Sequence, residues 1–227
     1  METTEKKYTN FAERMVKILG LKGSPVAIAL KDEIPPGLEK GAPARHCEMV
    51  QHVRQSAEQF YSTLDDHKCK GGAAVIGLAE IPENVANGDY YYKLGAFAST
   101  DASRNTMEFV PRIEKHSKYA IYSPLGSANF SPDLVVVLCT PKQAMQMVQA
   151  DLYTAGGRIQ TGFAGKQSLC GDIVANTINT NSVQVSLGCS GSRKHAKIDE
   201  NELIVGIPIQ RVEQMVDSLE KLFEAPK

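Results

Sequence analysis

The sequence contains no tryptophan and no apolar run approaching the roughly 20 residues that a membrane-spanning helix needs. Its first residues, Met1 to Lys7, are polar and lack the apolar core of a signal peptide. The formal net charge is −1, without the basic excess that is typical of nucleic-acid-binding proteins. We therefore expect a cytoplasmic protein that binds neither membranes nor nucleic acids.

Several motifs of well-known catalytic and cofactor sites are absent as well. The chain has no P-loop, no G-x-G-x-x-G after a predicted strand, no H-E-x-x-H and no G-x-S-x-G. It also has no C-x-x-C pair and no run of closely spaced cysteines. The short-spaced signatures of most zinc and iron–sulfur sites are therefore missing, and the cysteines that are present must be judged from their local settings.

The chain is long enough, at 227 residues, for one domain with a sizeable core. Apolar runs predict strands at 25–30, 73–78, 118–122, 133–139, 158–163, 182–187 and 202–207. Helices are predicted at 10–19, 44–61 and 140–156, after Ser168 and after Pro208. Segments 133–139, 140–156 and 158–163 together predict a right-handed βαβ unit. We predict a single α/β domain over residues 1–227, with a mixed sheet flanked by helices.

Four of the five cysteines occupy settings that favour a thiolate. Cys47 and Cys170 fall in the first turns of predicted helices, where unpaired N–H groups and the helix dipole stabilise negative charge. Cys69 and Cys189 lie in glycine-flanked loops beside predicted strands, and backbone N–H groups favour the anion there too. The spacing repeats, with 21 residues between the first two and 18 between the last two along the chain. We therefore consider two distantly related halves, each supplying two cysteines.

These four cysteines are predicted to meet in space and to hold a metal centre. A [4Fe–4S] cluster is usually bound by four thiolates and is the first choice. Structural zinc is the alternative, because four thiolates bind it too. Arg45 and Arg193 stand close to two of the cysteines and are predicted to offset the charge of the cofactor and tune its potential. The expected activity is redox or cluster-dependent chemistry on a small molecule, or electron transfer to a redox partner.

Other interpretations stay open. Cys189 could be a nucleophile with His195 or His46 as its base, in a thiol-dependent enzyme without a metal. The cysteines could also be ordinary buried residues of a small-molecule-binding protein. Cys139 ends an apolar strand and is expected to pack in the core. The sequence leaves the substrate, the redox partner and the formation of a homo-oligomer open.

A set of short motifs resembles one protein family. The motifs are Arg45-His-Cys47, Cys69-Lys-Gly-Gly72, Pro132-Asp-Leu-Val-Val136, Pro141-Lys-Gln-Ala144, Gly188-Cys-Ser-Gly-Ser-Arg193 and Gly206-Ile-Pro208. Together they resemble the uncharacterised ArCR family of archaea and bacteria, a domain of unknown function. The resemblance covers nearly the whole chain and implies a single-domain soluble protein, often from anaerobes. The family pattern carries cysteines that match Cys47, Cys69, Cys170 and Cys189, and it implies no substrate.

Overall fold

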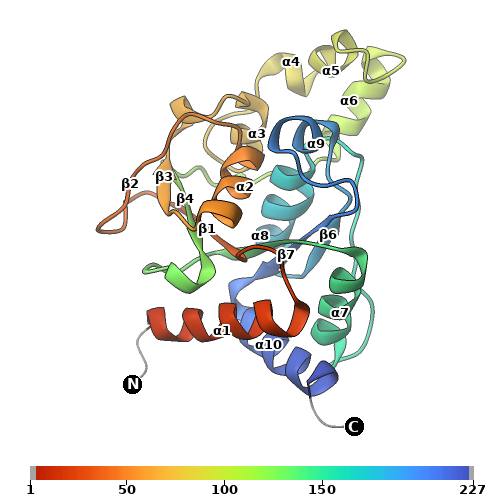
Figure 1. The fold of residues 1–227 in the computed structure, drawn as a ribbon. Coiled ribbons are helices and arrows are strands. Elements are labelled where there is room, and N and C mark those ends of the chain that lie inside the picture. Colours follow the sequence, from red (N-terminus) through yellow and green to blue (C-terminus); the bar gives the residue numbers. More distant parts are fainter. Residues whose placement is uncertain (1–3, 225–227) are drawn as a thin grey trace.

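A seven-stranded sheet organises the computed structural model, which describes residues 4–224 (Figure 1). The strand order is β2-β3-β4-β1-β5-β7-β6. The bounds are β1 Val26–Lys31, β2 Glu39–Lys40, β3 Phe60–Ser62, β4 Tyr119–Pro124, β5 Leu134–Cys139, β6 Gln184–Ser186 and β7 Leu203–Pro208. Only β2 and β3 pair in parallel, so the sheet is mixed. The predicted α/β class is confirmed. The predicted domain covers residues 1–227, but residues 1–3, which belong to the polar start of the chain, and residues 225–227 lie outside the described part.

Helices cover both faces of this sheet. The first face carries α1 Thr4–Leu19, α7 Pro141–Leu152 and α10 Ile209–Phe223. The second carries α2 His46–Ser56, α3 Lys70–Val75, the π-helix η3 Ser168–Ala175 and α9 Ser190–Ala196, with α8 Asn176–Thr180 continuing η3. Central strands alternate between the two cores: Ala27 and Ala29 of β1 face the first, and Val26 and Ile28 face the second. Burial on both faces explains why β5 is apolar at every position.

Three short helices form an extension beyond the second face. They are α4 Glu83–Ala86, α5 Asp89–Lys93 and α6 Thr100–Glu108, seen at the top of Figure 1. Two 3-10 turns, η1 Leu64–Asp66 and η2 Leu125–Ser127, complete the chain. The extension packs through a small apolar core of its own, in which Val85 and Met107 meet Val75 of α3 and Ala175 of η3. It is thereby fixed to the two helices that carry Cys69 and Cys170.

The two halves of the sheet repeat one order of elements. With β2, η1 and the extension left out, the first half runs β1, α2, β3, α3, β4; with α7 and α8 left out, the second runs β5, η3, β6, α9, β7. In each half the last strand lies between the other two and pairs antiparallel with both. The halves meet where β1 and β5 pair antiparallel at the centre. The repeated cysteine spacing thus accompanies a repeated topology, and a common origin of the halves remains a hypothesis.

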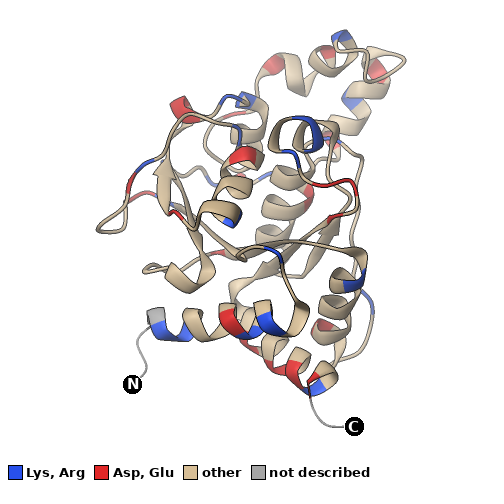
Figure 2. Cartoon of the chain, viewed as in Figure 1, with Lys and Arg blue, Asp and Glu red and all other residues tan. Residues whose placement is uncertain are grey.

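The first and last helices pack against each other along the first face. Basic residues of α1 pair with acidic residues of α10 (Figure 2). Lys7 Nζ lies 2.7 Å from Glu213 Oε2, and Arg14 Nη2 lies 2.8 Å from Asp217 Oδ1. These pairs are largely exposed and contribute little each, so the apolar faces of the two helices hold the contact.

Three of the predicted elements were wrong. Segment 73–78 is not a strand, because α3 begins directly after Cys69 and takes up its first half, and a turn follows. Segment 158–163 forms no strand, so the predicted βαβ unit is absent and β5 pairs antiparallel with β1 and β7. The helix predicted over 44–61 ends at Ser56, where Ala57 adopts a left-handed conformation and the chain turns into β3. No helix between residues 4 and 224 is both long and apolar enough to span a membrane.

Gly206, in the middle of β7, allows η3 and α8 to approach the sheet closely. A Cβ atom there would lie 2.9 Å from Ile173 Cγ2 and would overlap Thr177 Oγ1. Gly206→Ala should therefore lower the free energy of unfolding by about 1–3 kcal/mol, the usual cost of overpacking a core. Urea denaturation measures this, with Gly162→Ala as the control because a Cβ at Gly162 meets nothing within 4 Å. Equal stability of the two variants would contradict the prediction.

Candidate functional site

Two of the four predicted cysteines cap helices on the second face of the sheet. Cys69 is the N-cap residue of α3, and the Gly72 N–H donates to its Sγ at 3.4 Å. Cys189 is the N-cap residue of α9, and the Ser192 N–H donates to its Sγ at 3.4 Å. At most helix starts a serine or aspartate oxygen accepts this capping hydrogen bond, and here a cysteine sulfur accepts it instead. Each of the two sulfurs therefore lies at the positive end of a helix dipole.

The other two cysteines lie inside the first turns of helices, as predicted. Cys47 is the second residue of α2, and Cys170 is the third residue of η3. The Cys170 thiol donates to the Gln167 carbonyl oxygen at 3.3 Å. All four cysteines are therefore held at helix starts, and α9, which the sequence did not predict, provides one of them.

The four thiols lie close together and form what we call the cysteine group: Cys47, Cys69, Cys170 and Cys189. Burial, followed by the charges of Cys69, Cys189 and Cys47, raises the pKa of Cys170 well above its ordinary value. Burial, followed by the charges of Cys189 and Cys69, raises the pKa of Cys47 to about 12. A Cβ atom on Gly72 would lie 3.3 Å from Cys69 Sγ and 3.5 Å from Cys170 Sγ. Glycine thus leaves space between two of the sulfurs.

No group of three or more His, Cys, Asp or Glu side chains in the described part of the chain is arranged so that it could hold a metal ion. Each member of the cysteine group is partly accessible, in contrast to Cys139.

Gln167 and Tyr91 bring polar atoms to the edge of the cysteine group. Gln167 has a left-handed backbone with φ of 48° and is only 6% exposed, yet its Nε2 forms no hydrogen bond of normal geometry with any described residue. This nitrogen lies 3.0 Å from where a Cβ of Gly71 would stand. Burial and the charges of Cys170 and Cys69 raise the pKa of the neighbouring Tyr91, while the Gln167 side chain opposes that rise. A buried amide donor therefore lies beside the Tyr91 hydroxyl and close to the thiols.

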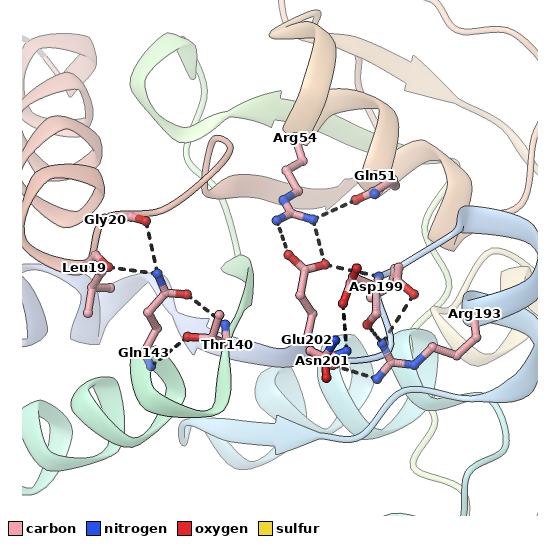
Figure 3. A network of polar contacts seen from close by, with 11 residues as sticks. Leu19, Gly20, Gln51, Arg54, Thr140, Gln143, Arg193, Asp199, Asn201 and Glu202 are labelled. Atoms are coloured by element: carbon pink, nitrogen blue, oxygen red, sulfur yellow. Dashed lines mark hydrogen bonds and ion pairs between the residues drawn. The ribbon is translucent and has the colours of Figure 1, made fainter.

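Arg193 uses its guanidinium to hold the chain on either side of α9. It donates to the carbonyl oxygens of Leu187 and Ile198, and to those of Asp199 and Glu202, which are labelled in Figure 3. The Glu202 carboxylate pairs with Arg54 of α2, and both side chains are almost fully buried. This network ties α2, which carries Cys47, to the connection between α9 and β7. The predicted tuning of a cofactor by Arg193 would act through charge, since its described hydrogen bonds go to carbonyl groups.

Arg45 and the two neighbouring histidines have different surroundings. Arg45 precedes α2, and its Nη1 lies 3.3 Å from Glu48 Oε2, so its charge is partly offset. His46 is buried, with Nδ1 2.8 Å from the Tyr122 hydroxyl. Burial lowers the pKa of His46 to about 3, so its ring is neutral and cannot offset negative charge at neutral pH. His195 lies half-buried on α9.

Cys139 stands apart from the cysteine group. It is 1% exposed and packs among residues of the first face, on the opposite side of the sheet from the other four. Burial raises the pKa of its thiol to about 12. The prediction that Cys139 packs in the core is confirmed.

Sequence reasoning missed Gln167, Tyr91 and Asp172. Tyr91 lies on α5 of the extension, a helix that the sequence did not predict. Gln167 occupies the N-cap position of η3 that was predicted for Ser168. Asp172 is a buried residue, and burial raises the pKa of its carboxyl group to about 6. Hydrogen bonds from Ser186 and Ser168 act in the opposite direction and lower this pKa. Of these three residues, only Gln167 could have been identified from the sequence, because it directly precedes a predicted helix start.

The fold and the site together define a mixed α/β protein with a cysteine group at converging helix starts. The model of the uncharacterised ArCR family matches residues 14–218. An uncharacterised protein of Methanocaldococcus jannaschii is 38% identical over 214 residues, which cover 92% of each chain. No solved structure matches the chain. The chain belongs to the ArCR family, as its motifs predicted.

Proposed function

We propose that this chain is an iron–sulfur protein in which Cys47, Cys69, Cys170 and Cys189 bind a [4Fe–4S] cluster. The observation that carries the proposal is the convergence of these four thiols from four separate helix starts. Burial disfavours a thiolate, and neighbouring thiolates repel one another. Both effects raise the pKa values of Cys170 and Cys47, so ionising the thiols costs free energy when nothing offsets their charge. A cationic iron–sulfur core would offset it, because a bound cation deprotonates coordinating thiols outright.

A cluster and a zinc ion need different spacings of the sulfurs. Four sulfurs around one zinc ion at about 2.3 Å must stand roughly 3.8 Å apart. A four-iron cluster is larger, and four thiolates surround it more widely. No three such side chains in the described residues are arranged to hold a metal ion, so the choice of a cluster rests on the number of the thiols and on their settings at helix starts.

The residues around the thiols fit such a cofactor. Gln167 Nε2 is a buried donor close to the thiols, and cluster sulfur atoms accept hydrogen bonds. The N–H groups of Gly72 and Ser192 already point at cysteine sulfur. Arg45 and Arg193 would act on the cluster through their charge. Hydrogen bonds and positive charge at a cluster raise its reduction potential.

The chemistry of such a centre is one-electron redox, or binding of a small molecule at the cluster. Within this scheme the chain's own residues hold the cofactor, exclude water from it and set its potential. The reduced thiols that the site requires persist in the cytoplasm, where we place the protein.

Purification without oxygen, followed by a visible spectrum and by iron, acid-labile sulfide and zinc analysis, tests this proposal. We expect a brown protein with about four irons and four sulfides per chain. Cys170→Ala should remove most of the iron because it deletes a ligand. Cys139→Ala is the matched control, because it deletes a buried thiol on the other face of the sheet and should keep the full iron content.

Two results would overturn the proposal. A colourless protein with one zinc ion per chain would make the site a structural or Lewis-acid centre. A colourless protein that stays metal-free after cluster reconstitution would leave Cys189, at the start of α9, as a reactive thiol.

A further inference from the structure

A cavity of about 370 Å³ lies between η3, the end of α6 and the segment around Phe163. Its walls include Phe109 and Phe163, which are 80% and 50% exposed, together with Val110 and Pro111. Large aromatic side chains on either wall of a hollow leave apolar surface uncovered. The volume falls in the range of small-molecule sites, which are apolar with a few polar groups.

The buried polar group of this cavity is the Asp172 carboxyl. Asp172 lines the cavity and is only 3% exposed. Ser186 donates to its Oδ2 at 2.9 Å. Across residues 4–224 no Lys, Arg or His lies within ion-pair distance of Asp172. Buried carboxylates are normally paired with a cation, so this one lacks its usual partner.

The walls are held in place from both sides. Thr161 donates to the Val185 carbonyl oxygen at 2.8 Å, which fixes the Phe163 segment to β6. Gly171 of η3 lets residues 110–111 approach closely, because a Cβ there would lie 2.8 Å from Val110 Cγ1. A hydrogen bond on one side and close packing on the other therefore hold the walls of the cavity in place.

We propose that this cavity binds a small organic cation, an ammonium or amidinium group carried on an apolar body. The cationic group would pair with Asp172, and the apolar body would lie between Phe109 and Phe163. Aromatic faces also attract cations, so the walls and the carboxylate favour the same ligand class. Residues two apart project about half a turn apart on a helix, so Asp172 and Cys170 face different sides of η3. This site is thus separate from the cysteine group and does not depend on the proposed cofactor.

Calorimetric titration of the intact protein with benzylamine and with the neutral benzyl alcohol tests the proposal. Benzylamine should bind at least tenfold more tightly, because the two probes share a ring and differ in the charged group. Asp172→Asn should reduce benzylamine affinity about tenfold, to the level of benzyl alcohol, since a tenfold change corresponds to about 1.4 kcal/mol. Glu108→Gln is the control, because it removes an exposed acid next to Phe109 and should leave binding unchanged.

Equal affinity of the wild-type protein for the two probes would overturn the proposal without any variant. Unchanged benzylamine binding by a folded Asp172→Asn protein would overturn it as well. Phe163→Ala supplies a variant that leaves the buried carboxyl intact, and it should weaken both probes. If binding of both probes survives Phe163→Ala undiminished, the ligand sits elsewhere.

Discussion

Arg54→Met is expected to destabilise the protein by about 3–5 kcal/mol, the cost of leaving one partner of a buried ion pair unpaired. The side chains of Arg54 and Glu202 are 9% and 12% exposed. Arg54 Nη1 also lies 3.0 Å from Glu202 Oε2, so the pair is bidentate. Methionine keeps most of the buried volume but leaves the Glu202 carboxylate without its cation. Urea denaturation followed by circular dichroism measures the change in free energy of unfolding.

An exposed pair on the extension provides the control for this prediction. Arg104 and Asp101 form an ion pair of similar length whose side chains are 50% and 82% exposed. Arg104→Met should change the free energy of unfolding by no more than about 1 kcal/mol. The double variant Arg54→Met, Glu202→Met should recover part of the loss, because no buried charge is left alone. Similar losses of unfolding free energy in Arg54→Met and Arg104→Met would contradict the prediction, because the buried ion pair would then contribute no more to stability than the exposed one.

Gly72→Ala should abolish iron binding while leaving the fold at least as stable. The added methyl group would stand between the sulfurs of Cys69 and Cys170, 3.3 and 3.5 Å away, in space that the proposed cluster needs. Gly72 lies in α3, where alanine is favoured over glycine by about 0.5–1 kcal/mol. We therefore expect iron per chain to fall from about four to near zero without loss of stability. Iron analysis and urea denaturation of the same sample separate the two effects.

Gly191→Ala is the matched control in the other capped helix. Its Cβ would lie 3.6 Å from Cys189 Sγ, an ordinary van der Waals contact, with no other atom close by. This variant should keep its iron. If Gly72→Ala retains full iron content, the space between Cys69 and Cys170 is not occupied by the cofactor.

Local sequence patterns predicted part of this fold well. The apolar run of β5 was correct, and so was the capping box of α7, in which Gln143 N–H donates to Thr140 Oγ1 at 3.4 Å. The start of α3 was missed because its cap is the Cys69 sulfur rather than a serine, threonine or aspartate. Its apolar Ala-Ala-Val-Ile run is too short for periodicity to separate a helix from a strand.

The candidate site was predictable only where local chemistry identifies it. Helix starts and glycine-flanked loops singled out four cysteines, and the structure holds all four at helix starts. Tyr91 reaches the group through tertiary packing of the extension, which no local pattern reports, whereas Gln167 lies close to Cys170 in the sequence. Arg193 was expected to serve a cofactor, yet its hydrogen bonds to backbone carbonyls depend on a turn at residues 198–202 that sequence alone does not reveal.

The pairing of α1 with α10 has a consequence for how the protein is made. About 190 residues separate the end of α1 from the start of α10. At 5–20 residues per second a ribosome needs on the order of 10–40 s to synthesise that length. During this interval Phe11 and Met15, which are buried in the finished molecule, lack the partner helix that covers them. Part of the apolar face of α1 therefore stays uncovered in the nascent chain until α10 has been synthesised.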